Sequence, residues 1–114
     1  MNWTERSDEG MQLIALSGDI DLQHSPKMRQ LLQSKATAQV PVLVLDFTEV
    51  KYIDSSGLAT LVEYYQKSRS YSGKIAMAGL SNRVRSVFDL VRLNEIFLIY
   101  PSVAEAQQGL RLLP

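Results

Sequence analysis

The chain has 114 residues, of which 46% are hydrophobic and 21% are charged, and twelve basic residues balance twelve acidic ones. This length and composition predict one globular domain over residues 1–114 and exclude a disordered or membrane-embedded chain. The zero net charge and the lack of a Lys or Arg run argue against direct nucleic-acid binding, and the lack of cysteine excludes disulfides and thiolate metal sites.

The first ten residues lack the basic start and the apolar stretch of a secretion signal. No window approaches the ~18 apolar residues that a membrane span needs. We therefore expect a cytoplasmic protein that does not insert into a membrane.

The chain begins with a predicted hairpin. Residues 3–7 form a weak strand pattern, residues 8–10 read as a turn, and residues 11–17 form a second strand pattern. Ser25 is the expected N-cap of a first helix that spans roughly residues 26–38, with proline at its first position. The continuous apolar run over residues 42–45 predicts a central parallel strand that is covered on both faces.

The rest of the chain alternates between helix and strand patterns. Apolar residues at helical spacing predict a second helix that runs from the region of Leu58 to Ser72, and a third helix that is capped by Ser81. Residues 75–78 and 96–100 are predicted strands, and Ser102 is expected to cap a short final helix. The sequence thus predicts an α/β fold: a mixed, mostly parallel sheet of about five strands, with an N-terminal β-hairpin and about four helices.

The clearest functional signal is the segment Leu45–Asp54, which is followed at once by Ser-Ser-Gly-Leu. An apolar strand leads through a short polar connection to two hydroxyls at the start of the second helix. Unpaired N–H groups and the helix dipole favour an anion at such a place, so Ser55 and Ser56 are candidates to carry a phosphate. Plain helix capping is the alternative that the residues themselves leave open.

Three segments carry a resemblance to a known family: residues 17–21, residues 52–58 and residues 84–97. The chain resembles STAS domains, and most of all the bacterial anti-sigma-factor antagonists. The sequence Asp-Ser-Ser-Gly-Leu is fairly specific for that family, whereas Gly-Asp-Ile-Asp is weak by itself, and Ala59 departs from a glycine that is often found there.

The resemblance implies a phosphorylation switch at Ser55, with Ser56 as the second choice. It implies that the unphosphorylated form binds an anti-sigma factor, which is also a serine kinase of the histidine-kinase-like ATPase fold, and so releases the sigma factor. Phosphorylation by that kinase ends the binding, and a serine phosphatase restores it.

The expected partner-binding residues surround this junction. They are Asp19, Asp21, Asp54, Ser56, Gly57 and Leu58. On the second helix, Tyr64 is expected to be more exposed than Tyr65 and available to a partner. From the residues alone, Asp19 and Asp21 are more simply turn and capping acids.

A second function is a STAS subunit of an ABC-type lipid-transport complex, which would bind its ATPase subunit through the same helix. The two hydroxyls favour the phosphorylation switch, because a purely structural contact requires no phosphate acceptor.

The sequence predicts no enzyme, cofactor or metal site. His24 is the only histidine, Asp19 and Asp21 have no third ligand at useful spacing, and no nucleophile and base stand together. A nucleotide-binding Gly-rich loop is also missing. Arg83 and Arg85 are expected on a solvated helix face.

Overall fold

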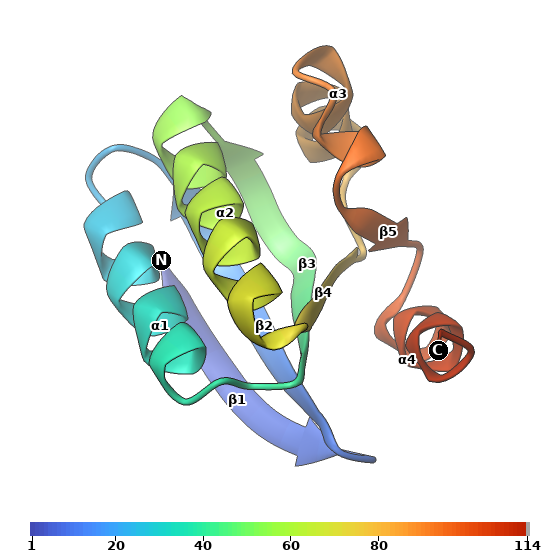
Figure 1. Ribbon diagram of the computed structural model, residues 1–114. Coiled ribbons are helices and arrows are strands. Elements are labelled where there is room, and N and C mark those ends of the chain that lie inside the picture. Colours follow the sequence, from blue (N-terminus) through green and yellow to red (C-terminus); the bar gives the residue numbers. More distant parts are fainter. Residues whose placement is uncertain (114) are drawn as a thin grey trace.

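A five-stranded mixed sheet forms the centre of the structure, a computed structural model that describes residues 1–113 (Figure 1). The strands lie in the order in which they occur along the chain, β1 to β5, and only the pair β1–β2 is antiparallel. Their bounds are β1 Asn2–Asp8, β2 Met11–Ile20, β3 Val42–Ile53, β4 Lys74–Ala78 and β5 Leu98–Tyr100. The predicted fold class is confirmed.

Helices cover both faces of this sheet. Their bounds are α1 Ser25–Thr37, α2 Ser55–Ser68, α3 Asn82–Leu90 and α4 Val103–Arg111, with short 3-10 turns at Arg69–Tyr71 and Leu93–Glu95. In Figure 1, α1 and α2 lie side by side in front of the sheet. Ala106 and Leu110 of α4 join a separate core cluster with Met11, Leu13 and Val44, whose side chains point to the other face.

The predicted hairpin is confirmed, and its turn follows from local chemistry. Asp8 pairs with Met11, so only Glu9 and Gly10 connect the two strands. Both residues have positive φ, 54° and 78°, which is the conformation that two-residue hairpins require. Glycine adopts it without strain.

Strand β3 is much longer than predicted. It was expected to end at residue 45 in a polar connection, but it continues to Ile53 beside β2, which itself extends to Ile20. The pairing of β2 with β3 contains two register shifts, and these place the buried residues Phe47, Val50 and Ile53 three apart instead of two. Because of these bulges, apolar and polar residues do not alternate in the second half of β3, and the sequence pattern did not predict a strand there.

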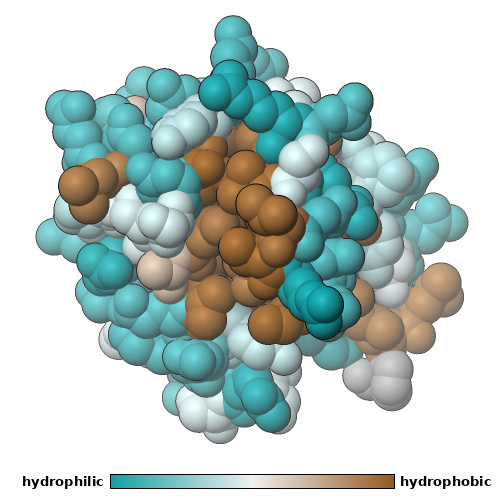
Figure 2. Space-filling model, turned by 90° about the horizontal axis from the view of Figure 1, so that it is seen from above, coloured by the Kyte–Doolittle hydropathy of each residue, from teal (hydrophilic) through white to brown (hydrophobic). Residues whose placement is uncertain are grey.

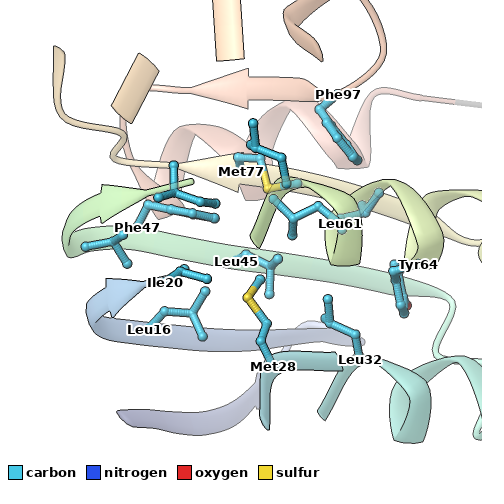
Figure 3. Packing of buried hydrophobic residues seen from close by; sticks show 14 of the residues in the cluster. Leu16, Ile20, Met28, Leu32, Leu45, Phe47, Leu61, Tyr64, Met77 and Phe97 are labelled. Atoms are coloured by element: carbon cyan, nitrogen blue, oxygen red, sulfur yellow. The ribbon is translucent and has the colours of Figure 1, made fainter. Parts of the chain in front are cut away.

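The main core lies between the sheet and helices α1, α2 and α3 (Figure 3). Figure 3 shows Met28 and Leu32 of α1 and Leu61 of α2 gathered around Leu45 of β3. Tyr64 belongs to this core as well: it is 2% exposed, so the expectation that it is exposed was wrong.

The physical reason lies in the stripe that α2 buries. Its inward face includes the small residues Gly57, Thr60 and Ser68 together with Tyr64, and an analysis of large apolar residues alone misplaces that face. The Tyr64 hydroxyl lies 3.3 Å from the Tyr71 hydroxyl, and burial raises the pKa of Tyr64.

Candidate functional site

Two parallel strands end side by side where α2 begins. Ile20 of β2 pairs with Ile53 of β3, so Asp21 and Asp54 follow neighbouring strand ends. The backbone N–H of Asp54 donates to the Ile20 carbonyl at 3.2 Å. The junction lies at the upper end of the sheet in Figure 1, where β3 passes into α2.

Asp54, and not a serine, caps α2. Its backbone is extended, with φ −113° and ψ −174°, and its Oδ1 accepts from the N–H of Ser56 at 2.9 Å and of Gly57 at 3.3 Å. The Ser56 hydroxyl donates to the same oxygen at 2.5 Å. The Ser56 hydroxyl and these N–H groups lower the pKa of Asp54, although burial opposes the shift. The carboxylate is therefore ionised at neutral pH.

The two candidate serines differ in their surroundings. Ser56 is half-buried, and its hydroxyl is bonded to Asp54. Ser55 is exposed, and within residues 1–113 its hydroxyl has no hydrogen-bond partner. Of the two hydroxyls, the one on Ser55 is therefore the one that an approaching protein can reach.

Gly57 and Leu58 support the junction from below. A Cβ on Gly57 would lie 2.7 Å from Cγ2 of Ile20, 2.8 Å from Cγ1 of Ile53 and 3.0 Å from the Ile20 carbonyl oxygen. Glycine thus lets the first turn of α2 rest on the strand ends. Leu58 is only 6% exposed, so its side chain packs in the core of the free protein.

Asp19, near the end of β2, and Asp21, directly after β2, have different surroundings. Asp19 is exposed and pairs with Tyr52 of β3. Asp21 is half-buried, and its Oδ1 accepts from the His24 N–H at 3.1 Å and lies 2.7 Å from the His24 Nδ1. Burial raises the pKa of Asp21, but the hydrogen bonds from His24 outweigh burial, so the pKa is below its ordinary value.

The expected N-cap at Ser25 was wrong. His24 is the N-cap of α1, and it makes no side-chain capping bond, while Ser25 is the first helical residue. The carbonyl of Asp21 accepts from the N–H groups of His24 and Ser25, at 3.1 and 2.8 Å, and so closes the turn without a serine cap. The Ser25 hydroxyl points back to the Leu22 carbonyl. Ser81 and Ser102, by contrast, cap α3 and α4 as predicted.

Sequence reasoning missed two features of this end of the molecule. Leu22 is 75% exposed between polar neighbours, and its backbone N–H helps to lower the pKa of Asp54. Arg83 is exposed as expected, but its guanidinium lies over the ring of Tyr52, 5.6 Å from the centroid. Figure 2 views this end from above and shows apolar residues gathered in the middle of a polar surround. The only indication of these features in the sequence was Leu22 itself, an apolar residue between the polar residues Asp21 and Gln23.

Other parts of the described chain show few alternatives for a site. Over residues 1–113, no three His, Cys, Asp or Glu residues form a group that could hold a metal ion. In the same range no helix is both long enough and apolar enough to cross a bilayer. A surface hollow between the C-terminal parts of α1 and α2, lined by Gln33, Thr37, Lys67 and Tyr71 among others, lies at the far ends of these helices from the serines.

These features define a class of α/β protein in which a mixed sheet presents an exposed serine on the first turn of its second helix. The chain belongs to the STAS domain family, which it matches over residues 2–106. It is 33% identical over 86 residues to the anti-sigma-B factor antagonist of Listeria monocytogenes, and the alignment covers 75% of each chain.

Solved structures share the fold. An anti-sigma factor antagonist from Mycobacterium paratuberculosis superposes with a TM-score of 0.88 at 24% identity, covering 96% of this chain and 93% of that one. The Bacillus cell fate determinant SpoIIAA in its phosphorylated form gives a TM-score of 0.74 at 16% identity, covering 96% and 99%. At these identities the likeness concerns the fold.

Proposed function

We propose that this protein is an anti-sigma-factor antagonist that works as a phosphorylation-controlled binding switch. Its unphosphorylated form binds an anti-sigma factor that is also a serine kinase of the histidine-kinase-like ATPase fold, and this binding frees the sigma factor. Phosphorylation of Ser55 ends the interaction, and a serine phosphatase restores it. The observation that carries the proposal is the exposed hydroxyl of Ser55, which has no partner within residues 1–113, beside the hydroxyl of Ser56, which donates to Asp54.

A phosphate at Ser55 changes the surface without requiring a change in the fold. It adds about −1.5 to −2 charges and three strong acceptor oxygens. A partner fitted to a bare hydroxyl must then desolvate this group and make room for it. A loss of ~3 kcal/mol in binding free energy weakens affinity by more than a hundredfold.

The supporting framework is rigid enough to keep the switch local. Gly57 is packed against Ile20 and Ile53, and Asp54 is tied to the backbone of β2. The relative from Listeria monocytogenes is an anti-sigma-B factor antagonist, and SpoIIAA has been solved in a phosphorylated form, which supports the same assignment for this chain.

The test is a kinase assay with matched serine variants. The purified protein, Ser55→Ala and Ser56→Ala are incubated with ATP and with candidate anti-sigma kinases from the same genome, and intact mass and peptide mapping follow. We expect the wild type and Ser56→Ala to gain one phosphate, and Ser55→Ala to gain none. Normal phosphorylation of Ser55→Ala would contradict the assignment of the site.

The same samples separate this function from that of a transport-complex subunit. An anti-sigma-factor antagonist binds the kinase in its unphosphorylated form and loses that binding once it is phosphorylated. A transport subunit would instead bind a transporter ATPase and would accept no phosphate from any of the kinases.

A further inference from the structure

The N-terminus of α2 is already occupied by an anion from the chain itself. The Asp54 carboxylate accepts from the N–H groups of Ser56 and Gly57 and from the Ser56 hydroxyl, all through Oδ1. These N–H groups are the ones toward which a phosphate on Ser55 would otherwise turn. The N–H groups of Ser56 and Gly57 are therefore already occupied.

The carboxylate holds this position firmly. Asp54 is fixed by its own N–H bond to the Ile20 carbonyl, and its carboxylate is bonded to the first turn of α2. The first turn of α2 has no room to rotate, because Gly57 lies against Ile20 and Ile53. A phosphate on the neighbouring residue would have to displace a bound, ionised group to reach the same N–H groups.

We propose that Asp54 is a positioning residue that keeps a phosphate on Ser55 off the helix N-terminus and directs it outward, to the surface that a partner meets. This inference rests on the proposed function, because it takes Ser55 as the residue that carries the phosphate. Without Asp54, the phosphate would accept hydrogen bonds from the N–H groups of Ser56 and Gly57 and would itself cap the helix. The motif thus places an acid directly before the serine in order to keep the added charge exposed.

The test compares three proteins that carry phosphoserine at position 55, installed during translation so that no kinase is needed. They are the otherwise wild-type chain, Asp54→Asn and Asp54→Gly. Asparagine keeps the capping oxygen without the charge, and glycine vacates the N–H groups while costing an N-cap only a few tenths of a kcal/mol. The readouts are the second pKa of the phosphate by phosphorus NMR and the amide resonances of Ser56 and Gly57 during the titration.

We expect the phosphate pKa to be highest in the wild type, where Asp54 repels the dianion, and to fall in Asp54→Asn. In Asp54→Gly it should fall by about one further unit, the size of shift that charge-assisted hydrogen bonds produce. The amide proton resonances of Ser56 and Gly57 should move much further during the phosphate titration in Asp54→Gly than in the wild type, where these N–H groups stay bonded to the Asp54 carboxylate.

The other charged and titratable residues at this end of the molecule are the same in the three proteins, so the comparison isolates residue 54. They are Asp19 near the end of β2, Asp21 directly after β2, His24 before α1, Lys51 on β3 and Arg83 on α3.

Equal phosphate pKa values in Asp54→Asn and Asp54→Gly would overturn the proposal, because vacating the N–H groups would then have no effect. The amides give a second check: if those of Ser56 and Gly57 move as far during the phosphate titration of the wild type as they do in Asp54→Gly, the carboxylate does not hold the position. Failure of any kinase to modify Ser55 would count against the proposed function and would leave this result unaffected.

Discussion

The two helices that follow β2 and β3 begin in similar ways, but the first serine is buried in one helix and exposed in the other. Each follows a parallel strand, each is preceded by an aspartate, and each has serine as its first residue, Ser25 in α1 and Ser55 in α2. Ser25 is only 4% exposed, and its hydroxyl faces the Leu22 carbonyl, whereas Ser55 is exposed.

The difference comes from where the aspartate stands. Asp54 is directly at the N-cap, so its carboxylate takes the free N–H groups and the next hydroxyl points away. Asp21 stands four residues before Ser25, and its carbonyl and carboxylate close a turn that draws the serine inward. A serine at a helix start is thus accessible or hidden according to the spacing of the acid before it.

The largest expected effect concerns the third residue of each helix, which is the buried Gly57 in α2 and the exposed Lys27 in α1. Gly57→Ala places a Cβ within 3.0 Å of Ile20 and Ile53. Overpacking of this kind lowers the free energy of unfolding by about 1 to 3 kcal/mol, and the better helix propensity of alanine recovers only part of it. Chemical denaturation measures the change.

Lys27→Ala in α1 is the matched control, and it should cost less than about 1 kcal/mol, because it removes only an exposed cation–π contact with Trp3. If both variants are equally stable, a side chain at position 57 is tolerated, and close packing of Gly57 on the strand ends is not required.

The next effect concerns the two aspartates and pH. Both have a pKa below the ordinary value of 3.8, so each stabilises the fold above that pH and loses its contribution as the pH falls through its lower, folded-state pKa. Asp54→Asn should therefore flatten the loss of stability below about pH 3.8, by less than the ~1 kcal/mol that complete removal of a cap costs, because protonated aspartate keeps a capping oxygen. At pH 7 it should change little, because asparagine caps nearly as well.

Denaturation curves between pH 2 and pH 7 test this prediction, with Ser55→Ala as a control that removes no titrating group. Asp21→Asn should flatten the curve less than Asp54→Asn, because Asp54 also accepts N–H groups of a helix. The reverse order would mean that ionised Asp21 in the turn before α1 stabilises the fold more than ionised Asp54 at the N-cap of α2.

Much of this fold was predictable because its signals are local. The alternation of helical and strand patterns predicted the element order, and the apolar run 42–45 predicted the central strand. The second half of β3 was missed because two register shifts break its alternation of period two. Tyr64 was misplaced because the buried stripe of α2 is completed by small residues, which carry little hydrophobic signal.

The site was predictable in place but not in detail. A strand, an acid and two serines before an amphipathic helix indicated the junction, and the family resemblance singled out Ser55. Which hydroxyl is free depends on the extended backbone of Asp54, with ψ −174°, and on how the first turn of α2 packs through Gly57 against Ile20 and Ile53. Contacts between residues more than thirty positions apart, such as Ile20 and Gly57, are not readable from a single sequence.

The smallest expected effect concerns the first serine of each helix, Ser55 in α2 and Ser25 in α1. Ser55→Ala removes an exposed hydroxyl that bonds to no other residue in the described range 1–113, so its free energy of unfolding should stay within about 0.5 kcal/mol of the wild type. Ser25→Ala removes a buried hydroxyl and leaves the Leu22 carbonyl without that donor, at a cost of up to about 1 kcal/mol. Thermal and chemical denaturation of the two single variants measure the difference. A larger loss for Ser55→Ala would show that its hydroxyl supports the fold, and a residue needed for folding is poorly suited to carry a reversible modification.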